Sequence, residues 1–214
     1  MHRSFQAFVL SGIILTSVMG SAAAFVQNPQ VTVSVFSDVQ IPSDVLLRAE
    51  QRAGKIFAQA GLELLWIDCT PASASGSNCK RTYGATDFVL RITSHVAAAT
   101  SDAAFGVAFL GADGRGRYAD VFWPKAQEFN AKWSIDLDRI LGCVIAHEMG
   151  HLLLGLNSHS ISGVMRAHWG SNELRQINRG NLLFLPEQGK RMRARFVDAS
   201  SAEISMGTRK KRHS

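Results

Sequence analysis

The sequence lacks several features that would assign it to other classes of protein. Its 214 residues show no internal repeat and no shift in composition, which argues against a repeat protein and against a second domain. After residue 24, no apolar stretch is long enough to cross a bilayer. The net charge is +6, but no basic patch is interleaved with aromatic residues, so we predict no nucleic-acid partner. The content of 46% hydrophobic and 19% charged residues is ordinary for a globular protein.

The two ends of the chain differ from its middle. Residues 1–24 combine a short positive start, a mostly apolar stretch and the small residues 22–24, a pattern typical of a cleaved signal peptide. We therefore predict an exported protein, secreted or periplasmic, with no stable membrane insertion after cleavage. An uncleaved anchor is the alternative, and the polar residues that interrupt the apolar stretch argue against it. Residues 199–214 are small and charged, and we expect a basic, disordered tail.

Cysteine is scarce, and its three positions are informative in an exported protein. Cys69 and Cys79 flank a loop of small and turn-forming residues. In an oxidising compartment a disulfide between them would limit the freedom of that loop, so we predict this bond. Cys143 is left over in an apolar run with the period of a helix, and we expect it to pack as a small buried hydrophobic residue.

Residues 25–198 form the predicted domain, in which strands and helices are mixed. Alternating or β-branched runs predict strands at 31–36, 62–67, 87–93, 103–110 and 118–123. Helical periodicity and turn signals predict helices at 43–60, 134–155, 171–180 and 186–195, with Ser134 as the cap of the second. The first strand, the first helix and the second strand favour a crossover that places the two strands parallel in one sheet.

The residues that indicate a chemical function lie in the second of these helices. The segment 147–151 reads HEMGH, and residues four apart lie on one face of a helix, so His147 and His151 can present two imidazoles to one ion. Glu148 then lies beside the metal, where a general base can take a proton from activated water. Zinc is the expected ion, because it suits neutral imidazole and a catalytic zinc site has three protein ligands and one open position.

The third ligand has more than one candidate. His159 is favoured, because Gly155 and Asn157 allow the chain to leave the helix and turn back toward the metal. Glu173, on a predicted downstream helix, would instead give a gluzincin-type site like that of thermolysin. It also fits the first turn of that helix, where the helix dipole favours an acid. His168 is the other candidate.

This segment resembles the signature of the metzincin metallopeptidases, H-E-x-x-H-x-x-G-x-x-H followed by a methionine turn. The matching residues are HEMGH at 147–151, then Gly155, His159 and SGVM ending at Met165. The glycine comes one residue late, and the position of the family's third histidine is occupied by Asn157. The resemblance implies that His147, His151 and His159 bind zinc, that Glu148 is the catalytic base, and that Met165 lies beneath the metal.

The resemblance also implies a fold and an activity. The fold would be α+β and zincin-like, a twisted mixed sheet of about five strands packed on a crossover helix and a zinc-binding helix, with a small helical C-terminal part. An antiparallel edge strand, here residues 103–110, would pair with the extended substrate. We predict a secreted zinc metalloendopeptidase that acts on a peptide or protein. The alternatives are a non-catalytic secreted zinc- or peptide-binding module on a peptidase fold, and a zinc hydrolase of a non-peptide amide. The sequence makes no prediction about the oligomeric state.

Overall fold

The computed structural model describes residues 28–70, 77–80, 82–96 and 104–196. The predicted signal peptide and the predicted basic tail lie outside these residues, so both stay predictions. Within the described part of the chain, no helix combines the length and the apolar character needed to span a membrane.

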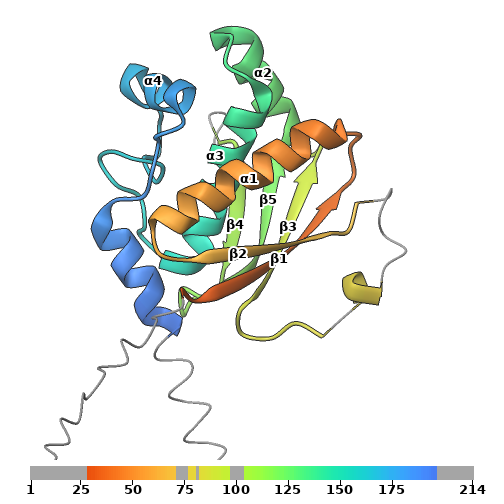
Figure 1. Ribbon diagram of the computed structural model, residues 1–214, viewed down its shortest axis with the longest axis vertical. Helices are drawn as coiled ribbons and strands as arrows, with labels where there is room; N and C mark the ends of the chain where they lie inside the picture. Colours follow the sequence, from red (N-terminus) through yellow and green to blue (C-terminus); the bar gives the residue numbers. More distant parts are fainter. Residues whose placement is uncertain (1–27, 71–76, 81, 97–103, 197–214) are drawn as a thin grey trace, which may run out of the picture.

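Five strands form one mixed sheet in the order β2-β1-β3-β5-β4 (Figure 1). The strands are β1 (Gln30–Ser37), β2 (Glu63–Asp68), β3 (Asp87–Thr93), β4 (Gly106–Leu110) and β5 (Gly116–Phe122). β1, β2, β3 and β5 are parallel, whereas β4 pairs antiparallel with β5 and forms one edge. The predictions of a mixed sheet of about five strands and of a parallel β1–β2 pair are therefore confirmed.

Helix α1 (Ser43–Gln59) is the crossover between β1 and β2, and helix α3 (Leu137–Leu154) packs against it. The close approach of the two helices depends on Gly142. A Cβ atom on Gly142 would lie 2.7 Å from Cβ of Arg52 and 2.8 Å from the carbonyl oxygen of Ala49. The C-terminal part contains α4 (Ser171–Arg179) and a further helix at 186–196, close to the predicted bounds.

Helix α2 (Trp123–Trp133) is missing from the sequence predictions, which end a strand at residue 123, directly before Pro124, and place the next helix at 134. Pro124 instead stands in the first turn of this helix, where its fixed φ angle is favourable and its missing N–H costs nothing. The predicted cap at Ser134 was also wrong. Ser134 ends α2 in the left-handed conformation with φ 52°, and Asp136 occupies the N-cap of α3.

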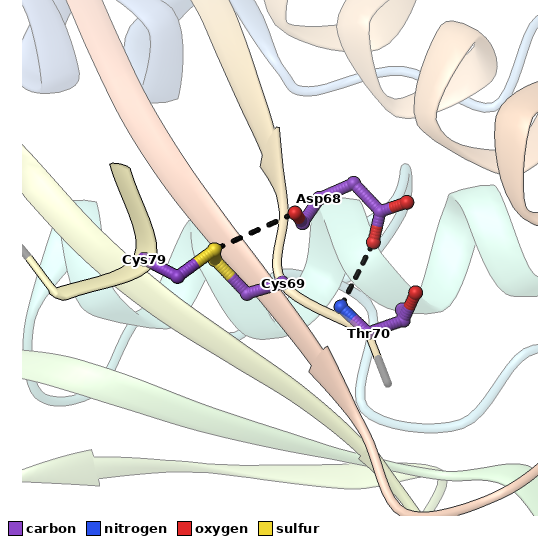
Figure 2. Close-up of a disulfide and its surroundings, with 4 residues drawn as sticks. All are labelled: Asp68, Cys69, Thr70 and Cys79. Atoms are coloured by element: carbon purple, nitrogen blue, oxygen red, sulfur yellow. Dashed lines mark hydrogen bonds between the residues drawn. A yellow bond between two sulfur atoms is a disulfide. The ribbon is translucent and has the colours of Figure 1, made fainter. Parts of the chain in front are cut away.

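The cysteines have the predicted arrangement. Cys69, directly after β2, forms a disulfide with Cys79 in the short 3₁₀ helix η1 (Ser77–Lys80), as Figure 2 shows. The Thr70 N–H donates to the Asp68 carboxylate at 2.9 Å beside this disulfide. Cys143 is a free, buried thiol in α3, and burial raises its pKa to about 12. It therefore belongs to the core, as predicted.

Candidate metal centre

Helix α3 is a rigid support for the side chains it carries. Most of its residues are buried, which is expected of a helix that is apolar on nearly every side. It ends where the sequence predicts, because Gly155 (φ 82°, ψ −160°) and Asn157 (φ 55°) both have a positive φ angle, which a continuing helix does not allow. The Gly155 N–H donates to the carbonyl oxygen of His151 at 2.9 Å and closes the last turn. The chain then folds back over the C-terminal half of the helix.

This reversal brings His159 beside His147 and His151. One ligand nitrogen from each of the three imidazoles lies within 4.8 Å of the others, and this group can hold a metal ion. The ring centroids are 4.8 Å apart for His147 and His151, 5.4 Å for His147 and His159, and 4.7 Å for His151 and His159. The Nε2 atoms of His147 and His151 are only 3.1 Å apart, so these two nitrogens are directed at the same point.

Hydrogen bonds on the far side of two rings fix their orientation. The Nδ1–H of His147 donates to the carbonyl oxygen of Val164 at 2.7 Å, which leaves the Nε2 lone pair free. Nδ1 of His151 is 2.7 Å from Oγ of the buried Ser158, and donation to that hydroxyl leaves Nε2 free in the same way. Histidine ligands of metals have such partners as a rule, because the partner sets the tautomer and raises the basicity of the ligand.

The protonation states also suit metal binding. Burial lowers the pKa of His147 to about 4 and the pKa of His151 to about 3, and it lowers the pKa of His159 as well. The three imidazoles therefore lie close together as neutral rings at neutral pH. Neutral imidazole is the form that binds a metal ion.

Glu148 is buried beside this cluster, with 5% of its surface exposed. Burial raises the pKa of its carboxyl group to about 8. The first residue of β4, Gly106, leaves room for the side chain, since a Cβ atom there would be 2.7 Å from Cγ of Glu148. Both Gly106 and Glu148 line the same cleft. The carboxyl group is thus confined between α3 and the edge strand.

The segment that ends at Met165 lies directly against α3. Met165 is fully buried, and its Sδ atom would be 2.4 Å from a Cβ atom at Gly150, one residue before His151. The Ser160 N–H donates to the carbonyl oxygen of Met165 at 3.0 Å, which closes the turn. The side chain predicted to lie beneath the metal is therefore packed against the helix between the two histidines.

Neither rival for the third position belongs to the histidine cluster. Glu173 is fully buried and its Oε2 accepts hydrogen bonds from the Gly170 N–H at 2.9 Å and from Nη1 of Arg166 at 2.8 Å. These bonds place it at the start of α4, in the role of first-turn acid. His168 is exposed and lines the cleft, but among the described residues the metal-binding group consists of His147, His151 and His159.

The three histidines and Glu148 line a cleft with a volume of about 390 Å³. Its lining includes the edge strand β4 with the residues before it, and the segment 166–169. Trp169 stacks on Phe105 at 5.6 Å between ring centroids and donates its indole N–H to the carbonyl oxygen of Val164 at 3.2 Å. Arg166 and Ser158 have no role in the sequence predictions, and Phe105 enters them only as part of the predicted edge strand 103–110. The position of Arg166 directly after Met165 could have drawn attention to it.

Comparisons with known proteins show a similarity of fold. No family model and no curated protein matches the sequence. Among solved structures, a zinc-dependent peptidase from Methanocorpusculum labreanum aligns with a TM-score of 0.50 and 18% identity, over 75% of this chain and 99% of the other. An archaemetzincin from Methanopyrus kandleri aligns with a TM-score of 0.46 and 20% identity, over 76% of this chain and 93% of the other. The chain thus shares the fold of the M. labreanum peptidase.

Proposed function

We propose that this protein is a zinc-dependent metallopeptidase that hydrolyses peptide bonds. The observation that carries the proposal is the convergence of three neutral imidazoles, from His147, His151 and His159, beside the buried carboxyl group of Glu148 in an open cleft. The shared fold with a protein described as a zinc-dependent peptidase is consistent with it.

The donor set fits zinc. Three imidazole nitrogens with one side open to a cleft match the ligand number of a catalytic zinc site, in which the fourth position is left for water or substrate. The Nδ1 atoms of His147 and His151 are engaged by Val164 and Ser158, so both rings offer Nε2. Carboxylate-rich sites, which calcium and magnesium prefer, have a different composition.

The chain itself supplies a base and a place for the substrate. Zinc, when bound, supplies a Lewis acid that polarises the scissile carbonyl and makes the attacking water more acidic. The Glu148 carboxylate takes a proton from that water and delivers it to the nitrogen of the leaving amine as the C–N bond breaks. Burial raises the pKa of Glu148, which favours the return of the proton, whereas a nearby cation favours the ionised form that accepts it.

The edge strand suggests how a peptide would bind. β4 pairs with β5 on one side, and residues 104–108 and 110 line the cleft. An extended peptide can add to such an edge through main-chain hydrogen bonds, which would place its backbone next to Glu148 and the histidines. This arrangement favours a peptide bond over a non-peptide amide as the bond that is cleaved.

The decisive variant is Glu148→Gln, which removes the base and retains the shape of the side chain. We expect this variant to bind zinc as the wild type does, and its rate of peptide hydrolysis to fall by about 10²–10⁴-fold. The measurements are metal content after dialysis and cleavage of a mixed peptide library with and without a chelator. Glu128→Gln, an exposed residue of α2, is the matched control. Unchanged hydrolysis by Glu148→Gln would show that the mechanism is wrong, and zinc binding by a wild type that cleaves no peptide would favour the non-catalytic alternative.

We propose in addition that the protein is exported. The signal-like pattern at residues 1–24 supports this, and so does the disulfide between Cys69 and Cys79, because such bonds persist in oxidising compartments. Cell fractionation and N-terminal sequencing test the proposal. A mature chain that begins at Phe25 outside the cytoplasm is expected, and a chain that keeps residues 1–24 in the cytoplasm would contradict it.

A further inference from the structure

A single arginine is among the described residues that line the cleft. Arg166 directly follows Met165 and lines the same cleft as the three histidines. Its backbone is fixed by hydrogen bonding, since its N–H donates to the carbonyl oxygen of Gly163 at 3.1 Å. Its side chain is 41% exposed, whereas that of its ion-pair partner Glu173 is fully buried. The guanidinium group is therefore held by a buried carboxylate while part of the side chain remains exposed to solvent.

Most of the hydrogen-bonding capacity of this guanidinium is unused. Nη1 donates to Oε2 of Glu173 at 2.8 Å, and within the part of the chain that the structure describes the side chain makes no other hydrogen bond. An arginine side chain carries five N–H donors in a planar fork that matches a carboxylate. Because Glu173 is also bonded to the Gly170 N–H, it restrains the arginine and leaves several donors available.

Arg166 differs in charge from the other ionisable residues that line the cleft. The ionisable residues of the lining are Glu148, Arg166 and the histidines 147, 151, 159 and 168. Glu148 is buried and serves as the proposed base, and His147, His151 and His159 converge on the proposed metal site. Arg166 is the one side chain of this described lining that carries a permanent positive charge, and the lining contains no exposed carboxylate to compete for it.

We propose that Arg166 binds a carboxylate of the substrate, so that the preferred substrates are peptides that present an anionic group beside the scissile bond. This inference rests on the proposed peptidase function. The group that Arg166 would bind is a carboxylate, which can be the C-terminus of the peptide or an internal Asp or Glu side chain. In the first case the enzyme removes residues from a C-terminal end, and in the second it cleaves within chains.

The test uses two matched pairs of peptides. In one pair the C-terminus is a free carboxylate or an amide, and in the other an internal Glu is replaced by Gln. We expect the wild type to prefer the carboxylate member of at least one pair, and Arg166→Gln to lose about 10–100-fold in kcat/KM on that member, mainly through KM. This magnitude corresponds to one hydrogen bond to a charged group. The amide and Gln peptides should be cleaved at nearly unchanged rates.

Two further variants separate recognition from a structural role. Arg166→Gln leaves Glu173 buried without its cation, so the double variant R166Q/E173Q, which removes that charge, must show the same loss of preference. Arg175→Gln, an exposed arginine of α4 outside the cleft, is the matched control and should keep the preference. An equal loss on all four peptides, or a wild type without preference in either pair, would overturn the proposal.

A binding measurement keeps this inference separate from the proposed function. Calorimetric titration of the same peptides into Glu148→Gln protein requires no cleavage. Tighter binding of the carboxylate member, abolished when Arg166→Gln is added, supports the role of Arg166 even if the wild type hydrolyses nothing. Equal binding of both members in both pairs would overturn it even if the protein is an active zinc peptidase.

Discussion

Gly106 and Glu148, 42 positions apart in the sequence, touch in the folded protein so closely that the glycine cannot carry a side chain. A Cβ atom on Gly106 would lie 2.7 Å from Cγ and 2.9 Å from Cδ of Glu148, and 2.4 Å from the carbonyl oxygen of Asp120. The first residue of the edge strand therefore sets the position of the proposed catalytic carboxyl group.

Replacing Gly106 with Ala should displace Glu148 and shift the edge strand away from the carbonyl oxygen of Asp120, without removing any metal ligand. A shift of about 1 Å in a catalytic group can cost about 10²-fold in rate. We expect kcat/KM for peptide hydrolysis to fall by about 10–100-fold while zinc binding is retained. Gly54→Ala in α1 is the control, because its new Cβ would be 3.8 Å from Nε1 of Trp66, an ordinary contact. Full activity of the Gly106→Ala protein would contradict the proposed position of the base.

His159 should be indispensable for metal binding, whereas its two rivals should not. His159→Ala removes one of the three clustered imidazoles, and we expect zinc affinity to fall by more than about 100-fold, beyond the effect of losing a supporting hydrogen bond. His168→Ala and Glu173→Gln should retain the metal. Competition with a chromophoric chelator measures all three affinities. Loss of zinc from Glu173→Gln, with retention in His159→Ala, would favour the gluzincin-type site.

Ser158 should tune the metal site through His151. Its Oγ is 2.7 Å from Nδ1 of His151, and partners of this kind typically contribute about 10–100-fold to metal affinity. We expect Ser158→Ala to weaken zinc binding by that factor. Ser160→Ala is a matched control in the same turn, because the Ser160 hydroxyl donates to the carbonyl oxygen of Ser162 at 2.8 Å and, among the described residues, makes no hydrogen bond to a histidine. Equal zinc affinities for the two variants would show that Ser158 has no such role.

Glu50 should make the protein less stable as the pH rises. Burial, and then the charge of Asp68, raise its pKa to about 7, and its Oε1 has no hydrogen-bond partner within the described chain. The folded protein therefore binds a proton that the unfolded chain has released above its ordinary pKa of 4.5. The free energy of unfolding therefore falls as the pH rises from 4.5 to about 7, and it stays at the lower value above that range.

The variant Glu50→Gln should remove this loss. The free energy of unfolding of this variant should equal that of the wild type below pH 4.5 and exceed it by about 1–2 kcal/mol above pH 7. This figure is smaller than the full pKa shift implies, because Glu50 lines an open cavity in which solvent screens its charge. Urea unfolding of both proteins at matched metal content across this range measures the difference. A constant difference at every pH would contradict the raised pKa of Glu50.

Patterns that are local in sequence were sufficient for most of the fold. Short runs that alternate or are rich in β-branched residues predicted all five strands, because these preferences are local to the segment. Helix α2 was overlooked because proline commonly ends a strand but is also favoured in the first turn of a helix. Which of the two applies to Pro124 depends on how the preceding strand is placed. The true N-cap of α3, Asp136, lies two positions after the predicted Ser134.

The sequence by itself determined that His147 and His151 lie one helical turn apart on one face, because helical spacing brings residues four apart together, and that the carboxyl group of Glu148 lies beside them. It also determined where α3 ends, through Gly155 and Asn157. Only the tertiary structure decided that His159 reaches the cluster, that Gly106 confines Glu148, and that Glu173 holds Arg166 at the cleft. These contacts join segments that are far apart in the sequence. Their distance in space depends on how the turns and strands pack, which a local sequence pattern does not determine.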